Sequence, residues 1–269
     1  MTIRAGVAGW PIAHSLSPVI HSAWIRAAGL DAAYTAFGPE SDDRFRELVG
    51  EVRQGTVRGL NVTAPWKEIA LGLADEASDT ARACGSANLL WQDGGVLRAD
   101  STDGHGLMAA LMEQAPTLEM KGNIATVLGA GGAARAAVHA LGQVFAEVRI
   151  VNRTTARAEA LIAAVQPHTS ARLTCSRADT DAALIVNALS VPPELDMTAL
   201  APGAVLMDMT YRPLMTGFLS AGGERGHAVV DGLAMLIGQA RPSFATLFGL
   251  ATPDVDVRAE ALRVLGEQA

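Results

Sequence analysis

Short apolar segments alternate along the chain with segments in which apolar residues recur every three or four positions. Apolar runs at residues 3–7, 33–37 and 57–62 predict strands, whereas residues 18–28 and 42–53 have the periodicity of amphipathic helices. A good N-cap at Ser17 and a stop at Gly29 set the ends of the first helix. Such alternation predicts βαβ units and a mainly parallel sheet.

The pattern starts again in the second half of the chain. Strands are expected at 123–128, 148–151, 183–187, 205–208 and 227–230, and helices at 132–141, 155–165, 235–248 and 255–265. A glycine-containing turn at Asp103-Gly104 precedes a further expected helix at 107–112 and marks the boundary between the two patterns. We therefore expect an α/β fold with two domains.

The composition is that of a globular protein with enough apolar material for a core. Of the 269 residues, 49% are hydrophobic and 18% are charged. The net charge of −7 argues against a nucleic-acid partner, because binding to phosphates requires clustered Lys and Arg. No apolar stretch reaches about 18 residues, so we expect no membrane span.

Two further features indicate the cellular setting. The first ten residues lack the basic flank and the apolar run of a signal peptide, so we expect a cytoplasmic protein. The two cysteines, Cys84 and Cys175, have neither metal-ligand nor redox spacing. We expect both to be buried as apolar residues, and we expect no metal site.

A strand, a glycine turn and a helix start follow one another at residues 126–135. A dinucleotide-binding fold needs this order, because one glycine forms the tight turn and another lets the backbone approach the pyrophosphate at the helix N-terminus. The spacing of the glycines differs from the usual one, and a plain strand-helix turn is the alternative. The glycines of this turn are Gly129, Gly131 and Gly132, with Ala130 between the first two and Ala133 after the last.

The end of the next strand favours NADP over NAD. A fold that binds NAD usually places an acidic residue there, on the ribose 2′-hydroxyl. This chain instead has Asn152, Arg153 and Thr154, followed by Arg157. Two guanidinium groups and a hydroxyl suit a 2′-phosphate, which a carboxylate would repel. In the alternative interpretation both arginines are solvated at a helix start.

Polar residues also follow two strands of the N-terminal half. Ser15 and Ser17 lie beside a predicted helix N-terminus, where hydroxyl and backbone donors can hold a carboxylate. Asn61, Thr63 and Lys67 surround the end of the third strand, and ligands of open α/β sheets bind beyond the carboxyl ends of strands. The alternative for this segment is a capped helix with a solvated lysine.

Three further polar residues have positions that suit a binding site. Asn88 is expected at the end of another short apolar run, and Gln239 is the strongly polar side chain of an otherwise apolar helix entrance. Asp103 precedes Gly104 at the boundary turn. Taken alone, Asp103 is more simply a turn residue or a helix cap.

Taken together, these segments resemble the shikimate dehydrogenase family. The matches extend from Gly9 to Gln239, in the order and at the approximate spacings of that family, and they are specific jointly rather than singly. The resemblance implies an N-terminal α/β substrate domain and a Rossmann-like NADP-binding domain with a cleft between them. Residues 1–103 with 239–269 would form the first domain and residues 104–238 the second.

The resemblance also implies an activity. It is the NADP-dependent, reversible reduction of 3-dehydroshikimate to shikimate, in the shikimate pathway of aromatic amino acid biosynthesis, by a monomer or homodimer. Such a reduction needs a hydride from the nicotinamide and a proton from a protein acid, since negative charge grows on the carbonyl oxygen. By their match to the family, Lys67 would donate the proton and Asp103 would orient Lys67 and a substrate hydroxyl.

The remaining roles follow from the resemblance by position. Ser15 and Ser17 match ligands of the substrate carboxylate. The full substrate-binding set would be Ser15, Ser17, Thr63, Lys67, Asn88, Asp103, Tyr211 and Gln239. On the cofactor side, the family pattern adds Asp79, Met209 and Gly232 to the glycine turn and to the residues that would bind the 2′-phosphate.

Several positions depart from the family pattern. Leu89 stands where threonine is usual, and the loop after Asn187 is shorter than in the family. Because these changes touch the substrate and nicotinamide sides, a paralogue that acts on quinate or another polyol acid is the first alternative. Another two-domain NADP enzyme, such as a methylenetetrahydrofolate dehydrogenase, would not need Ser15 and Ser17. A non-catalytic NADP-binding protein would need neither catalytic residue.

Overall fold

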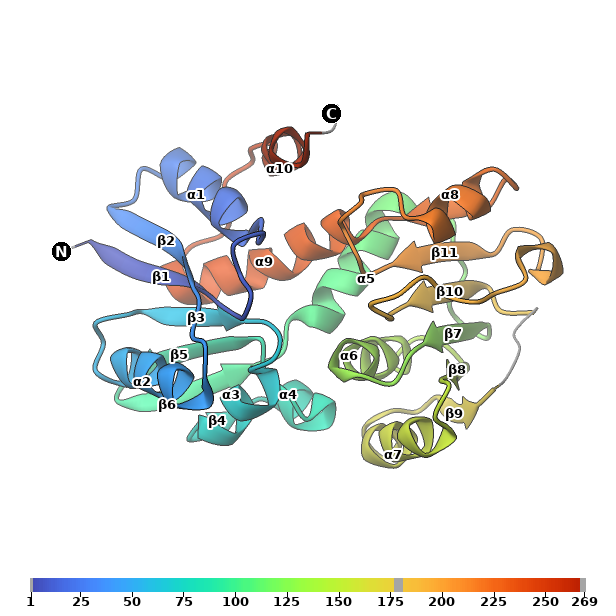
Figure 1. The fold of residues 1–269 in the computed structure, drawn as a ribbon, viewed down its shortest axis with the longest axis horizontal. Helices are drawn as coiled ribbons and strands as arrows, with labels where there is room; N and C mark the ends of the chain where they lie inside the picture. The colour runs from blue at the N-terminus through green and yellow to red at the C-terminus, as the bar shows by residue number, and fades with distance from the viewer. Residues whose placement is uncertain (1, 177–180, 267–269) are drawn as a thin grey trace. The chain divides into compact units, whose positions relative to one another are not determined.

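The computed structural model describes residues 2–176 and 181–266. Residues 1 and 267–269 of the expected substrate domain lie outside the described residues, as do residues 177–180 of the expected NADP-binding domain. The fold is α/β, which confirms the predicted class (Figure 1).

The chain forms two compact units. Met1–Thr102 and Gln239–Ala269 make up the first unit, and Asp103–Gly238 makes up the second. The second unit includes Asp103, because this residue begins helix α5 (Asp103–Gln114), whereas the sequence places the boundary after it. Helix α9 (Gly232–Phe248) begins in the second unit and ends in the first.

The first unit is built on a six-stranded sheet with the strand order β2-β1-β3-β5-β6-β4. Its strands are β1 (Ile3–Ala8), β2 (Ala32–Phe37), β3 (Gly59–Val62), β4 (Glu76–Ala77), β5 (Leu89–Asp93) and β6 (Val96–Asp100). β1 pairs in parallel with β2 and β3, which the alternation of strands and helices predicts. β5 is antiparallel to both β3 and β6, which the sequence pattern does not predict.

The β5–β6 hairpin decides where Asn88 lies. Gly94 and Gly95 form its turn with φ values of 58° and 88°, a region that glycine adopts without steric cost. Asn88 therefore lies just before β5 and not at the end of an apolar run, as the sequence suggested. Because β5 runs antiparallel to β3, its start lies beside the carboxyl end of β3, where Val62 N donates to Asn88 O at 2.8 Å.

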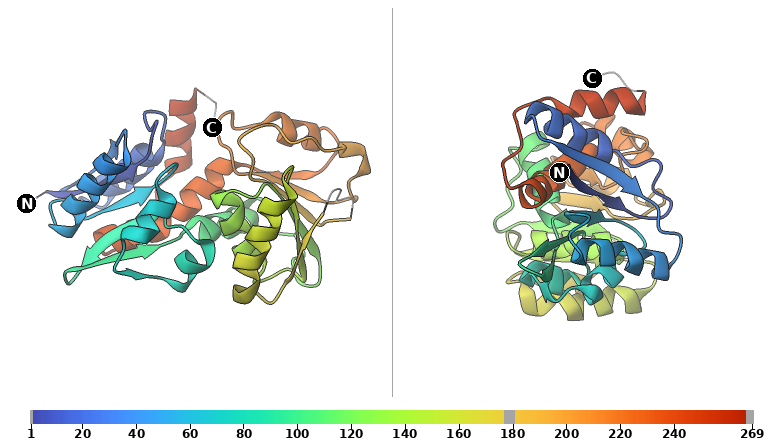
Figure 2. Two further views of the ribbon diagram at one scale, coloured as in Figure 1. Left: turned by 60° about the horizontal axis from the view of Figure 1, so that its bottom comes forward. Right: turned by 90° about the vertical axis from the view of Figure 1, so that its left-hand side faces the viewer.

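Helices cover both faces of this sheet. They are α1 (Ser17–Ala27), α2 (Asp42–Arg53), α3 (Lys67–Leu73), α4 (Asp79–Cys84) and the end of α9, while α10 (Val257–Leu265) packs against α1. Phe45 of α2 packs in one core cluster with Leu60 of β3, whereas a Cβ on Gly59 would meet Leu247 of α9 on the opposite face. α10 lies beside α1, where Arg26 and Glu260 form an ion pair at 2.8 Å (Figures 1 and 2).

A buried aromatic cluster joins α1, β2 and α9. The ring of His21 stacks on Tyr34 with the centroids 3.9 Å apart, and Trp24 meets Phe244 edge-on at 5.5 Å. His21 is 1% exposed, and its Nδ1 has no hydrogen-bond partner among the described residues. Because burial disfavours the charged imidazolium, the pKa of His21 is lowered from 6.5 to about 3. His21 is therefore a neutral part of the core.

The second unit has an all-parallel sheet of doubly wound topology. Its strands are β7 (Ile124–Leu128), β8 (Glu147–Val151), β9 (Arg172–Cys175), β10 (Leu184–Asn187), β11 (Val205–Asp208) and β12 (Ala228–Val230). Their spatial order, β12-β11-β10-β7-β8-β9, reverses direction between β7 and β10. Ligands of such sheets bind beyond the carboxyl ends of the strands at this switch point.

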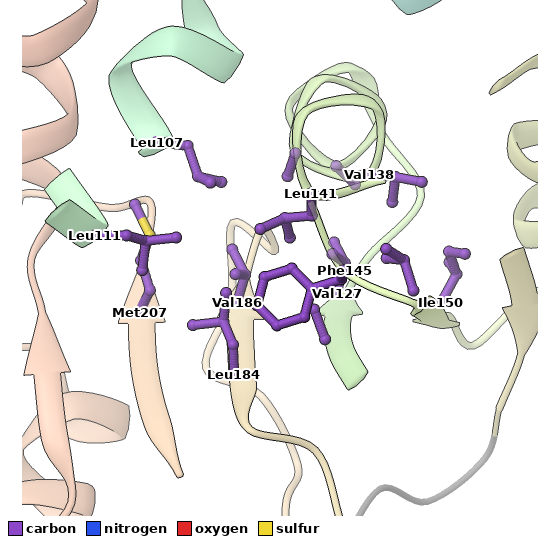
Figure 3. Packing of buried hydrophobic residues seen from close by; sticks show 14 of the residues in the cluster. Leu107, Leu111, Val127, Val138, Leu141, Phe145, Ile150, Leu184, Val186 and Met207 are labelled. Atoms are coloured by element: carbon purple, nitrogen blue, oxygen red, sulfur yellow. The ribbon is translucent and has the colours of Figure 1, made fainter. Parts of the chain in front are cut away.

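A continuous apolar core holds the helices on this sheet. Helices α5, α6 (Gly132–Leu141) and α7 (Thr155–Val165) cover one face, and α8 (Gly217–Gly223) covers the other. Figure 3 shows Leu107 and Leu111 of α5 and Leu141 of α6 directed toward the strand residues Val186 and Met207. The bounds of α2, α6 and α7 are those that the sequence predicts.

Four predicted helix starts need correction: α5 begins at Asp103 and not at residue 107, and α10 begins at Val257 and not at residue 255. α1 begins at Ser17, and Leu16 holds the N-cap position, so Ser17 is the first helical residue and not the N-cap. α9 begins at Gly232 and not at residue 235, because Asp231 Oδ1 accepts a hydrogen bond from Ala234 N at 3.0 Å and caps the earlier turn.

The expectation that both cysteines are buried is wrong for one of them. Cys84 is buried at the end of α4, whereas Cys175 is exposed, because β9 forms an edge of its sheet. Within the described ranges, no cluster of three or more His, Cys, Asp or Glu side chains suits a metal ion. No helix in that part of the chain is long and apolar enough to cross a membrane.

The buried His21 predicts a pH dependence of stability. Between pH 6.5 and about 3 the unfolded chain binds a proton on His21 that the folded chain does not. The free energy of unfolding should therefore fall as the pH decreases through this window, by up to about 1.4 kcal/mol per pH unit. His21→Phe keeps the aromatic stack and should flatten this slope in urea denaturation. The control is His105→Gln, on an exposed histidine. Equal slopes in wild type and His21→Phe would contradict the assignment.

Candidate active site

The segments that follow β1 and β3 are joined by backbone hydrogen bonds. Thr63 N donates to Ala8 O at 2.8 Å, and Trp10 N donates to Ala64 O at 3.1 Å. Thr63 is half-buried in the second of these segments, and Ser15 is half-buried in the first. The structure thus places both predicted residues beyond the carboxyl ends of adjacent parallel strands, where a ligand site is expected.

Ser15 and Ser17 lie together at the N-terminus of α1. Ser15 Oγ accepts a hydrogen bond from Ser17 N at 3.3 Å, and Ser17 is buried. Ser15, and not Ser17 as the sequence predicts, thus supplies the hydroxyl that accepts a backbone N–H at the start of α1. Hydroxyl groups and free N–H groups at the start of an eleven-residue helix favour an anion such as a carboxylate.

Lys67 is the first residue of α3 and is half-buried. The turn before it is closed by a bond from Trp66 N to Thr63 O at 3.0 Å, and the Trp66 ring stacks on Phe45 in the core. Lys67 O accepts from Ala87 N at 2.9 Å, which ties the start of α3 to the segment that leads to Asn88. The backbone of Lys67 is therefore held by buried contacts on both sides.

The carboxamide of Asn88 joins three segments of the first unit. Its Nδ2 donates to Thr102 Oγ1 at 3.0 Å and to Gln239 Oε1 at 2.8 Å, and its Oδ1 accepts from Thr102 N at 2.8 Å. Asn88 is 3% exposed, and its bonds to Thr102 are buried, whereas the bond to the half-buried Gln239 is partly buried. The structure thus brings together two predicted substrate residues, Asn88 and Gln239, that lie far apart in the sequence.

The half-buried amide of Asn61, which the sequence places at the end of the third strand, extends this network to Tyr34 and Ser243, two residues that sequence reasoning did not assign to the site. Tyr34 donates its hydroxyl to Asn61 Oδ1 at 2.7 Å, and Asn61 Nδ2 donates to Ser243 Oγ at 2.8 Å. Ser243 in turn donates to Gln239 O at 3.1 Å. Burial raises the pKa of Tyr34 well above its ordinary value of 10, so its hydroxyl keeps the proton that it donates. The position of Ser243 one helical turn after Gln239 is the one signal that the sequence offers.

Asp103 is the first residue of α5 and is 4% exposed. It follows Thr102, the residue bound by Asn88, by one peptide bond. Tyr211 is half-buried in the segment between β11 and α8 of the second unit. The backbone before this segment is held by Asp208, whose Oδ1 accepts from Thr210 N at 2.9 Å.

The backbone geometry requires two of three glycines in the second unit, and it does not require the third. Gly129 has φ +117°, which the tight turn after β7 requires. A Cβ on Gly232 would lie 2.5 Å from Thr210 O and 2.7 Å from Met209 O, so there is no room for a side chain. A Cβ on Gly132, at the start of α6, would meet nothing within 4 Å. The fold itself therefore does not require a glycine at position 132.

The rest of the glycine turn is open to a ligand. Gly131 holds the N-cap position of α6 without a side-chain cap, and it is exposed like Gly132. Ala130 and Ala133 are half-buried beside them. Uncapped N–H groups at the start of a ten-residue helix, at the switch point of the sheet, suit a pyrophosphate.

The expected 2′-phosphate residues lie between β8 and α7. Arg153, Thr154 and Arg157 are exposed, and neither guanidinium forms an ion pair within the described part of the chain. Asn152 Nδ2 donates to Thr154 O at 2.8 Å and orders the turn. Thr154 is the N-cap of α7, yet its side chain makes no capping bond. These groups thus remain available to an anion.

A buried carboxylate that the sequence does not single out organises the ends of β10 and β11. Asp208 Oδ2 accepts from Asn187 Nδ2 at 3.0 Å and from Thr216 Oγ1 at 2.8 Å. Asp208 is 2% exposed, so its three bonds replace water. Met209 follows directly and donates its N–H to Asn187 O at 3.0 Å. This cluster fixes the segment that carries Met209 and Tyr211.

Asp79 differs from the other predicted residues. It is the first residue of α4, its side chain is 97% exposed, and it forms an ion pair with Arg82 at 2.7 Å. An acidic residue at this position stabilises a helix start, which accounts for it without a ligand.

The two glycines at helix starts predict opposite effects on stability. Gly232→Ala should lower the free energy of unfolding by about 1–3 kcal/mol, because the added methyl group meets backbone oxygens. Gly132→Ala should raise it by up to about 1 kcal/mol, since the methyl group enters open space and alanine favours a helix more than glycine does. Urea denaturation of both ligand-free variants measures the difference. Equal stability of the two variants would contradict the geometry.

Comparisons with known proteins agree with this arrangement. The sequence profile of the shikimate dehydrogenase substrate binding domain matches residues 7–90. The NADP-dependent shikimate dehydrogenase of Caulobacter vibrioides is 48% identical, over 98% of this chain and 96% of that protein. The shikimate 5-dehydrogenase of Thermus thermophilus, solved with NADP(H) and shikimate, is 34% identical with a TM-score of 0.87, over 97% and 99% of the two chains.

The fold is shared beyond enzymes that bear this name. A ligand-free 5-ketofructose reductase of Gluconobacter has a TM-score of 0.87 and 26% identity, over 99% of this chain and 98% of that one. The high identity to the Caulobacter protein over almost the whole of both chains decides the assignment. This chain belongs to the shikimate dehydrogenase family.

Proposed function

We propose that this chain is an NADP-dependent oxidoreductase that reversibly reduces 3-dehydroshikimate to shikimate, and so serves the shikimate pathway of aromatic amino acid biosynthesis. The observation that carries the proposal is the bond from Asn88 Nδ2 to Gln239 Oε1 at 2.8 Å. It joins two distant segments that each match a substrate-binding motif of the family. The activity for which the Caulobacter relative is named supports the same reaction.

The described residues fit NADP. Gly132 leaves open space that the fold does not need, and Arg153 and Arg157 present charge for a 2′-phosphate. Met209 and Gly232 would line the nicotinamide side, and Gly232 lets the start of α9 lie against Met209 O. When bound, the nicotinamide supplies or accepts the hydride.

The polar groups of the first unit fit a hydroxylated acid. We assign the substrate carboxylate to Ser15 and Ser17 at the N-terminus of α1. Thr63, Asn88 and Gln239 would hold the ring hydroxyls. Because Gln239 Oε1 is engaged by Asn88, the amide nitrogen of Gln239 remains as a donor to a substrate oxygen.

We assign the proton transfer to the substrate carbonyl oxygen to Lys67, with Asp103 as the residue that orients it. Tyr211 would bind the substrate. Of the 21 cationic side chains, only Lys67 and Lys121 are lysines, and the rest are arginines. Arginine stays protonated in proteins and cannot serve as a general acid, whereas a lysine can. A lysine at position 67 in so arginine-rich a chain is therefore the choice that proton transfer requires.

A paralogue that acts on quinate or another polyol is the second candidate. The likeness to a 5-ketofructose reductase shows that the fold accommodates a different ketone in another protein. Residues 189–193, in the shortened loop after Asn187, border a cavity of about 310 Å³ together with Thr210 and Arg212. This loop is where the substrate range would change.

The proposal includes the cellular compartment and the oligomeric state. We infer a cytoplasmic enzyme that works as a monomer or homodimer on a small molecule. The acidic net charge of −7 and two cysteines that form no disulfide among the described residues support this setting.

Cofactor and substrate are tested in one spectrophotometric assay. Wild type should reduce NADP with shikimate and should prefer NADP over NAD in kcat/KM. Arg157→Ser should lower kcat/KM for NADP by roughly 10- to 100-fold, since a charge-assisted phosphate contact is lost. The kcat/KM for NAD, which has no 2′-phosphate, should be unchanged. Arg172→Ser, at an exposed position of β9, is the matched control. Turnover of quinate alone would favour the second candidate, and a preference for NAD would refute the 2′-phosphate assignment.

The role of Lys67 is tested by two substitutions. Lys67→Ala should lower kcat by about 10²–10⁴-fold with a smaller rise in KM, because proton transfer is felt in the transition state. Lys67→Arg keeps the charge without the transferable proton, so it should be about as slow. Lys121→Ala, on the other lysine of the chain, should retain the wild-type rate. Recovery of kcat in Lys67→Arg would assign charge rather than proton transfer to this residue.

A further inference from the structure

A cavity opens at the end of the first sheet that is opposite to Ser15 and Thr63. It has a volume of about 720 Å³, within the range of small-molecule sites, and Arg4, Arg58 and Gln92 line it. Arg58 and Thr63 lie on one extended strand, so about 16 Å separates the cavity from the carboxyl end of β3. The cavity is therefore separate from the proposed substrate groups.

The register of the sheet places these three side chains in one row. Ala5 is paired with Gly59 and Gly59 with Trp91, and Arg58 N donates to Arg4 O at 2.7 Å. One residue further along each strand, Arg4, Arg58 and Gln92 are thus neighbours on three adjacent strands. Adjacent strands are about 4.8 Å apart, so the two arginine side chains leave neighbouring strands on the same face of the sheet.

The row faces the helix α2. Side chains alternate between the two faces of a strand, so Ala8, Leu60 and Leu90 lie on the same face as Arg4, Arg58 and Gln92. All three apolar residues belong to the core cluster that α2 covers. The chain that leaves α2 forms the other wall, where Gln54 and Thr56 line the cavity. Arginine, glutamine and threonine side chains from four segments thus converge on one space.

Two cations side by side on adjacent strands repel each other unless an anion lies between them. Five other arginines of this unit are ion-paired with carboxylates: Arg26, Arg44, Arg53, Arg82 and Arg98. Neither Arg4 nor Arg58 forms such a pair within residues 2–176 and 181–266. The acidic residues nearest in sequence, Asp31, Glu51 and Asp93, do not line the cavity.

We propose that this cavity binds a small phosphate monoester. Two guanidinium forks a strand apart match a dianion whose three terminal oxygens accept from both, whereas a single carboxylate has one charge and two oxygens. The volume exceeds that of a free phosphate, and Gln54, Thr56 and Gln92 offer partners for the hydroxyls of the organic part. The ligand is thus a phosphorylated, hydroxylated metabolite.

The test uses the full chain saturated with NADP, so that the phosphate-binding residues of the second unit are occupied. Glycerol 3-phosphate is titrated and followed by backbone amide chemical shifts. Saturable shifts are expected at Thr56, Arg58 and Gln92 by about 10 mM. Arg4→Gln and Arg58→Gln should each raise the dissociation constant at least about tenfold. Arg46→Gln, on an exposed arginine of α2 outside the cavity, should leave it unchanged.

Three comparisons make the result decisive. Glycerol should give no shifts, and succinate tests whether carboxylates suffice. Saturation by succinate at the same concentration would overturn the phosphate assignment. Shifts that do not saturate, or that are equally weakened by Arg46→Gln, would overturn the site. Unchanged thermal midpoints of the variants establish that they fold, since both arginines are exposed.

Discussion

The hydrogen bonds of one buried carboxamide, that of Asn88, determine the geometry of the first unit's site. Its nitrogen and oxygen satisfy Thr102 and Gln239 at 2.8–3.0 Å, and leaving such a group unsatisfied costs about 1–3 kcal/mol. Because Asp103 follows Thr102 directly, the same amide fixes the chain that leads to the proposed partner of Lys67. The antiparallel β5 is what brings Asn88 to the end of β3, where Thr63 lies.

In the second unit, the site depends on the space around the backbone of its glycines as well as on the buried carboxylate of Asp208. Gly129 is required by its positive φ, and Gly232 by the oxygens against it. Gly132 has neither reason, and a glycine at a helix start weakens the helix by about 1 kcal/mol relative to alanine. A glycine that weakens the helix and that the packing does not require is explained by a ligand that approaches the backbone there. Together with Arg153 and Arg157, which form no ion pair in the described part of the chain, the open space at Gly132 favours NADP.

Much of the fold could be predicted because its signals are local. The amphipathic spacing gives the bounds of α2, α6 and α7, and the motif order gives the family. The β5–β6 hairpin could not be predicted, because Leu89 and Leu90 are both buried and no period-two pattern remains. Tyr34, Ser243 and Asp208 were missed for another reason. Their roles arise from contacts between segments that are distant in sequence, and each residue type alone is ordinary.

The most direct test of this account is the shikimate affinity of Asn88→Ala, measured by calorimetry alongside its NADP affinity. Asn88 bonds to proposed substrate-binding groups of the first unit, whereas the glycine turn that would bind NADP lies in the second unit. Shikimate should therefore bind at least about tenfold more weakly, since a buried amide and its alignment of Gln239 are lost. NADP binding should be unchanged. Unaltered shikimate affinity, or an equal loss for both ligands, would contradict the central role of Asn88.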